Sequence, residues 1–74
     1  MARDREFFVN EKDVTKVIKA IQDNILFGAP SLCVGNCGWA NRPETWFVMV
    51  RLRRKTYNRV LDTLNQEGVI LESK

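Results

Sequence analysis

The sequence of 74 residues contains no histidine. Histidine is the commonest general base in enzymes and the commonest side-chain ligand of metal ions, and it activates the nucleophile in Ser-His and Cys-His pairs. The chain also has no glycine-rich phosphate loop and no pair of carboxylates that the spacing places in one pocket. We therefore expect a protein that is not an enzyme, with no catalytic residues and no cofactor.

Cysteine is scarce: the chain holds two, Cys33 and Cys37, in the segment CVGNC. Without histidine, two thiolates supply only half of a tetrahedral zinc site, which a dimer would have to complete. A redox pair normally has the spacing C-x-x-C at the start of a helix, and disulfides are rare in the cytosol. We expect no metal site, and we interpret Cys33 as a buried, inert strand residue and Cys37 as a loop residue.

Long apolar runs are also missing. No stretch approaches the roughly 18 apolar residues that a membrane-spanning helix needs. The first residues, MARDREFF, alternate in charge and lack the apolar segment of a signal peptide. These two features predict a cytoplasmic protein with no membrane partner.

The composition is that of a small folded protein. Apolar residues make up 45% of the chain, which is typical of a globular protein, and the length predicts a single domain over residues 1–74. A domain of this size buries only about 60% of the surface of its unfolded chain, so its stability is marginal. Such domains often need a disulfide, a metal or a second copy, and we expect a homodimer.

Segments typical of strands and of helices alternate along the chain. In two segments apolar residues recur at spacings of three and four, which indicates a helix with one buried side. Asn10 is a typical helix N-cap, and Gly28 and Gly68 are typical of helix ends. The predicted elements are a strand at 6–9, a helix at about 11–27, a strand at 31–34, a loop at 35–44, a strand at 45–53, a helix at about 55–66 and a strand at 69–72.

The order β-α-β-β-α-β predicts an α+β fold. Its compact form is the ferredoxin-like βαββαβ sandwich, a four-stranded sheet with both helices on one face. Helices between strands imply right-handed crossovers and at least partly parallel pairing. If residues 31–44 are instead one irregular loop, the sheet has three strands. The resemblance is to a topology and to no particular family, and this fold hosts many unrelated functions.

The strand at 45–53 has no polar side. Alternate side chains of a strand point to opposite faces, and one set is wholly apolar and is predicted to pack under the helices: Trp46, Val48, Val50 and Leu52. The other set lies on the helix-free face and consists of Phe47, Met49, Arg51 and Arg53. The same alternation adds Phe8 to that face. An exposed patch of this kind is unusual in a monomer, and covering it is worth several kcal/mol at about 25 cal/mol per Å².

Three partners fit such a patch: a second copy of the chain packed sheet face to sheet face, a single-stranded nucleic acid, or another protein. Bases stack on aromatic rings with roughly 1–3 kcal/mol each, and RNA-binding domains of this topology carry aromatic residues on their two central strands. The segment TWFVMV has a loose likeness to that signature but lacks its glycine. In the plainer interpretation, Phe47 and Met49 are core residues under the loop at 35–44 or the termini.

Charge is unevenly distributed. The net charge is +3, yet no acidic residue occurs from 45 to 61, where the cations are Arg51, Arg53, Arg54, Lys55 and Arg59. The last three fall at a strand-to-helix junction, and cations at a helix N-terminus are unfavourable. This local inconsistency is typical of an anion-binding site, although a run of charge is also typical of a solvated surface.

The sequence thus favours a binding protein. Trp39 and Arg42, in the loop at 35–44, complete the candidate set as a possible contact pair. The first hypothesis is a small regulatory or accessory protein that binds nucleic acid through the open sheet face and the basic junction. The second is an inhibitor or adaptor that binds an acidic protein surface through the same aromatic residues and arginines. A small-molecule sensor with a ligand at a dimer interface is a more distant third.

Overall fold

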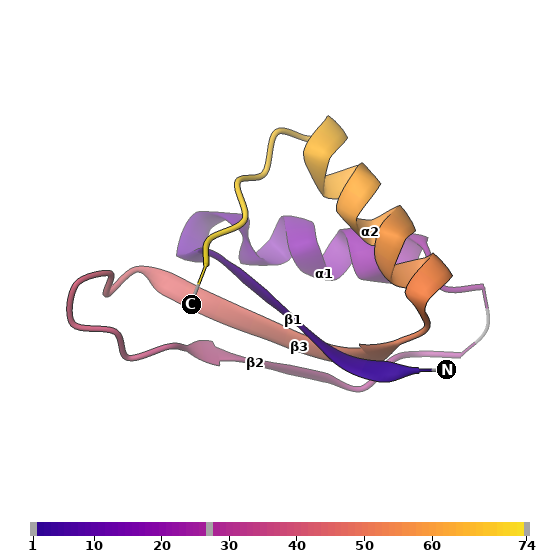
Figure 1. Ribbon diagram of the computed structural model, residues 1–74, viewed down its shortest axis with the longest axis horizontal. Coiled ribbons are helices and arrows are strands. Elements are labelled where there is room, and N and C mark those ends of the chain that lie inside the picture. Colours follow the sequence, from indigo (N-terminus) through magenta and orange to yellow (C-terminus); the bar gives the residue numbers. More distant parts are fainter. Residues whose placement is uncertain (1, 27, 74) are drawn as a thin grey trace.

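Two helices pack on one face of a three-stranded antiparallel sheet (Figure 1). The computed structural model describes residues 2–26 and 28–73. The strand order is β1-β3-β2, so β1 and β2 run parallel to each other on either side of the antiparallel β3. The elements are β1 (Arg3–Asn10), the 3-10 turn η1 (Glu11–Asp13), α1 (Val14–Asp23), β2 (Leu32–Asn36), β3 (Thr45–Leu52) and α2 (Arg54–Gln66).

The α+β prediction is confirmed, whereas the four-stranded ferredoxin-like sheet is not. Residues 69–72 meet the sheet at a single antiparallel bridge between Phe8 and Glu72. The expected parallel pairing of neighbours is wrong, because β3 separates the two parallel strands. The strand predicted at 31–34 is present but extends later, to Asn36.

The first helix is shorter than the predicted span of 11–27, and two asparagines explain its ends. The side chain of Asn10 accepts a hydrogen bond from the backbone N–H of Lys12 at 3.1 Å, as predicted for an N-cap, and a 3-10 turn precedes α1. At the other end, Nδ2 of Asn24 donates to the Ala20 carbonyl at 2.7 Å. The Asn24 backbone N–H bonds instead to Ile21 O at 3.2 Å, which ends the α-helical pattern. Phe27 lies outside the described residues.

The second helix ends in the glycine-based motif that the sequence predicted. Gly68 has φ of 73°, in the left-handed region. Its N–H bonds to Asn65 O at 3.1 Å, and the N–H of Val69 bonds to Leu64 O at 3.0 Å, as in a Schellman cap. This cap buries Val69 against the core and leaves Ile70 76% exposed. Among residues 69–73, the described contact with β1 is the bridge at Glu72.

The core lies between the helices and one face of the sheet. Both helices present the apolar stripes predicted from their spacing, and the β3 residues predicted to face them are buried except Trp46, which is half-buried. The indole Nε1 of Trp46 is itself buried and has no hydrogen-bond partner among the described residues. The buried apolar residues are Phe7, Val9, Val17, Ala20, Ile21, Val48, Val50, Leu52, Val60, Leu64 and Val69.

Candidate nucleic-acid interface

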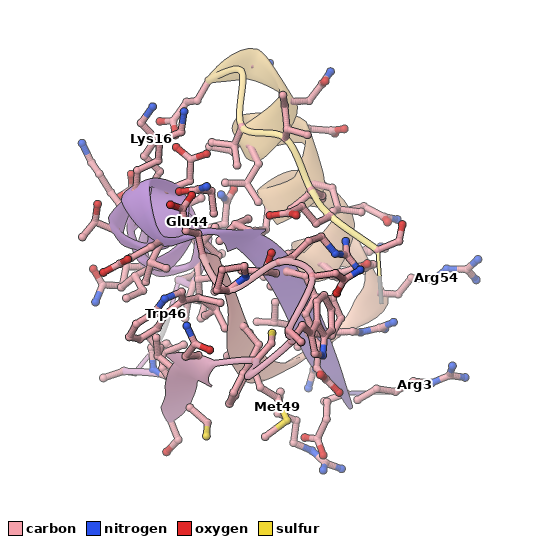
Figure 2. All side chains as sticks on the ribbon, turned by 90° about the vertical axis from the view of Figure 1, so that its left-hand side faces the viewer. Arg3, Lys16, Glu44, Trp46, Met49 and Arg54 are labelled. Atoms are coloured by element: carbon pink, nitrogen blue, oxygen red, sulfur yellow. The ribbon has the colours of Figure 1, made fainter. Side chains whose placement is uncertain are left out.

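The side of the sheet opposite the helices carries the predicted apolar patch. Phe8 of β1 and Phe47 of β3 are direct cross-strand partners. The Phe47 ring also lies over Gly35 of β2, where a Cβ atom would come within 3.1 Å of it. Met49 follows two residues along β3 and points away from the helices (Figure 2). All three large side chains are half-buried, so the sheet offers a flat apolar surface.

Trp39 extends this surface from the loop between β2 and β3. Its ring lies 5.3 Å from the ring of Phe8, measured between centroids. The guanidinium of Arg42 covers the indole at 4.5 Å, and it also forms an ion pair with Glu72 at 3.7 Å. The loop therefore packs on Phe8, whereas the plainer interpretation placed it over Phe47 and Met49. We call Phe8, Trp39, Phe47 and Met49 the aromatic face.

Carboxylates also border the aromatic face, which the sequence analysis did not consider. Glu6 is the cross-strand partner of Met49, and Asp4 is the partner of Arg51. Arg51 and Asp4 form an ion pair at 3.9 Å, with both side chains largely exposed. An exposed pair of this kind contributes little to stability. It does, however, compensate the one arginine that the strand places beside the aromatic residues.

The basic residues at the start of α2 lie apart from the aromatic face. β3 ends at Leu52, so Arg53 does not continue its open face as predicted. It is instead the N-cap residue of α2, and its side chain makes no capping hydrogen bond. Arg53 joins three other predicted cations and Thr56 around a surface hollow of about 440 Å³. We call these cations, Arg53, Arg54, Lys55 and Arg59, the basic junction.

A second hollow contains arginines that the sequence analysis missed. It has a volume of about 510 Å³ and adjoins the basic junction, because both include Arg54. Figure 2 shows Arg3 and Arg54 extending on the same side of the molecule, opposite Trp46. We call this site the arginine hollow; its lining residues are Arg3, Arg5, Arg54, Tyr57 and Asn58.

The basic residues of this second hollow are visible in the sequence, but the strand pairing that brings them together is not. β1 begins at Arg3, whereas a β-prone run alone placed its start at Glu6. Antiparallel pairing sets Arg3 opposite Leu52 and Arg5 opposite Val50, so the segment RDR comes to lie beside RLRR. The pairing of two basic strand ends would have predicted a shared cationic site.

The two cysteines lie in β2 and at the start of the loop between β2 and β3. Cys33 is exposed, so its prediction as a buried residue is wrong; it stands opposite Met49 at the outer strand of the sheet. Cys37 is half-buried at the start of the loop, as predicted, and its backbone N–H bonds to Thr45 O at 3.1 Å. Within residues 2–26 and 28–73, no three Cys, Asp or Glu side chains gather as metal ligands would.

Comparison of the chain with protein-family models, with curated protein sequences and with solved structures gives no match. Neither helix in the described part of the chain combines the length and apolar character needed to span a membrane.

Proposed function

We propose that this protein is a small, non-catalytic accessory protein that binds single-stranded nucleic acid. The observation that carries the proposal is the cationic end of the molecule, where β1 begins, β3 ends and α2 begins. Among the described residues, only Arg51 in this group has a carboxylate within ion-pair distance. The group comprises Arg3, Arg5, Arg51, Arg53, Arg54, Lys55 and Arg59.

The aromatic face supplies the second element of the proposal. Phe47 and Arg51 lie on the same side of β3, four residues and therefore about 13 Å apart. A single strand with bases on Phe8 and Phe47 thus has its backbone within reach of the cationic end. Stacking on aromatic rings and phosphate contacts with cations together describe sequence-tolerant binding of single strands.

The test is a titration of a fluorescently labelled oligonucleotide. Neutralising about four phosphates gives an affinity loss on the order of 50-fold between 50 and 200 mM salt. Replacing Phe8 and Phe47 together by leucine keeps the apolar volume and removes stacking, and about 1–3 kcal/mol of binding free energy per base should be lost. Absence of binding at low salt, with the protein folded, would reject the proposal.

A second candidate function has its own observation. Glu6 and Asp4 border the aromatic face, where they repel a phosphate backbone. An acidic protein that docks on the basic junction alone would avoid this electrostatic repulsion. In that case Arg53→Gln with Lys55→Gln abolishes capture of the partner, whereas the leucine variants of Phe8 and Phe47 leave it unchanged. Nucleic-acid binding requires both surfaces, so the two variants separate the hypotheses.

We also propose that two copies associate, through β2 rather than face to face. A face-to-face dimer would cover the aromatic face and exclude nucleic acid. β2 is one of the two edge strands of the sheet, contains no charged residue, and leaves Val34 38% exposed. An uncharged, unpaired strand edge readily accepts another strand. Light scattering after gel filtration should give the mass of a dimer for the native chain and of a monomer for Val34→Lys.

The finer fold assignment is a proposal of the same kind. We infer that the chain is a ferredoxin-like sandwich in which the fourth strand is reduced to one bridge. The order β1-β3-β2 and the antiparallel contact of Glu72 with the outer side of β1 support this inference. Insertion of one or two β-forming residues within 69–73 should lengthen the pairing with β1. Slower amide hydrogen exchange in this segment would measure the added hydrogen bonds.

A further inference from the structure

One wall of the arginine hollow is formed by Arg5, which has two contacts with the protein. Its guanidinium lies over the Tyr57 ring at 4.6 Å, and its Nε donates to the Leu52 carbonyl at 3.4 Å. The Tyr57 ring in turn contacts the buried Phe7, with 5.5 Å between centroids. These contacts orient the Arg5 side chain toward Tyr57 and the end of β3. Its two terminal nitrogens form no hydrogen bond with any described residue, so they remain available to a ligand.

The charges around the hollow are not balanced by the protein. Arg3 and Arg54 line it together with Arg5, and none of the three forms an ion pair within residues 2–26 and 28–73. The neighbouring acids in sequence, Asp4 and Glu6, alternate to the opposite face of the sheet, where Asp4 pairs with Arg51. Guanidinium groups that line one hollow without a carboxylate repel one another, and a bound oxyanion removes that repulsion.

Neutral donors complete the set. Asn58 carries a side-chain amide and Tyr57 a hydroxyl, and both residues line the hollow. Neither side chain forms a hydrogen bond within the described part of the chain. Planar guanidinium forks with neighbouring amide and hydroxyl donors match the several acceptor oxygens of a phosphate better than the two of a carboxylate.

We propose that the arginine hollow is a phosphate-binding site, with Arg5 as the fixed guanidinium and Arg3 and Arg54 closing over the anion. This site deepens the proposed function. It rests on that function only for the source of the phosphate, which is a nucleic-acid strand. The same chemistry would accept free inorganic phosphate or the terminal phosphate of an oligonucleotide.

The first experiment uses inorganic phosphate and the ¹⁵N-labelled protein. Phosphate should shift the amide signals of residues 3–5 and 54–58 along a saturating curve. Arg3→Gln and Arg54→Gln change exposed side chains, so folding is preserved, and each should weaken binding about tenfold. The control variant, Lys12→Gln with Lys16→Gln, removes two exposed cations elsewhere and should leave the curve unchanged. Shifts that do not saturate, or that are equal in all variants, would overturn the proposal.

The second experiment separates the phosphate site from the function as a whole. A labelled oligonucleotide is titrated with and without a 5′-phosphate, in the native protein and in Arg3→Gln. Stronger binding of the phosphorylated strand, lost in Arg3→Gln, identifies the strand end as the source. Equal binding that inorganic phosphate displaces identifies the backbone. If oligonucleotide binds but phosphate leaves residues 3–5 and 54–58 unshifted, the site is rejected and the function stands. If phosphate binds but no oligonucleotide does, the phosphate site stands and the proposed function is rejected.

Discussion

At the scale of single residues, Asn24 connects the two helices through one amide group. Its Nδ2 donates both to Ala20 O in α1 and to the Thr63 hydroxyl in α2, the latter at 3.1 Å. The Thr63 hydroxyl donates its own proton to Arg59 O at 2.9 Å, so it can only accept from Asn24. Aspartate has the same shape but no side-chain N–H, so it cannot donate to Ala20 O or to the Thr63 hydroxyl.

Asn24→Asp should therefore destabilise the protein. The carboxylate would face two acceptor oxygens in a partly buried position, and the loss is about 2 kcal/mol. For a domain of this size, thermal denaturation should show a decrease of about 4–8 °C in melting temperature per kcal/mol. Gln22→Glu, which adds the same charge to an exposed position in the same helical turn, is the control. Equal melting temperatures of the two variants would contradict the role given to the amide.

Gly35 is the other residue whose identity matters, because the Phe47 ring occupies the space of its absent side chain. Gly35→Val should overpack this contact and cost about 1–3 kcal/mol of stability. In a Phe47→Ala background the same substitution should cost little or be favourable, since valine suits a strand. Urea denaturation of the four proteins in a double-mutant cycle measures the coupling. Additive costs would show that ring and glycine do not share this space.

At the scale of elements, the C-terminal segment acts through Glu72 rather than through strand pairing. Its Oε1 accepts a hydrogen bond from the Thr45 hydroxyl at 3.0 Å and lies 3.7 Å from Arg42, and its backbone N–H bonds to Phe8 O at 2.7 Å. Thr45 is only 2% exposed. Through its side chain and its backbone N–H, this one residue joins β3, the loop that carries Trp39 and the outer side of β1.

Glu72→Ala should leave the buried Thr45 hydroxyl without its acceptor, at a cost of about 1–3 kcal/mol. Combining it with Thr45→Val removes the orphaned group and should restore part of the stability. Glu67→Ala, at an exposed position without a side-chain partner in the described residues, is the control. Denaturant midpoints compare the four proteins, and a double variant less stable than Glu72→Ala would contradict this explanation.

At the scale of the whole molecule, the positive charge is unevenly distributed. The chain carries +3, yet its unpaired arginines gather where β1 begins and α2 begins, while Lys16 lies on the opposite side (Figure 2). Long-range attraction of a polyanion depends on this distribution.

Two variants of equal net charge test this asymmetry. Arg53→Gln with Lys55→Gln should elute from heparin at clearly lower salt than the native protein. Lys12→Gln with Lys16→Gln should elute close to it, although both variants carry the same charge. Identical elution of the two would indicate that binding follows net charge alone. Circular dichroism confirms that both are folded.

The sequence by itself determined the two helices, the first three strands, the caps at Asn10 and Gly68, and the side of each helix that faces the core. Hydrophobic period, Asn10 and Gly68 are local signals, and they act on residues only a few positions apart. The same alternation placed Phe8, Phe47 and Met49 opposite the helices. Those parts of the candidate site could be predicted because a strand's two faces are set by counting along the chain.

Only the tertiary structure decided the strand order, the missing fourth strand and the meeting of Arg3 and Arg5 with Arg54. These depend on contacts between residues about 50 positions apart, which no local period encodes. After the helix cap at Gly68, the described residues pair with β1 at Glu72 alone. Whether this segment forms a strand depends on three-dimensional geometry. Charges that are distant in the chain became one site because antiparallel pairing brought two basic strand ends together.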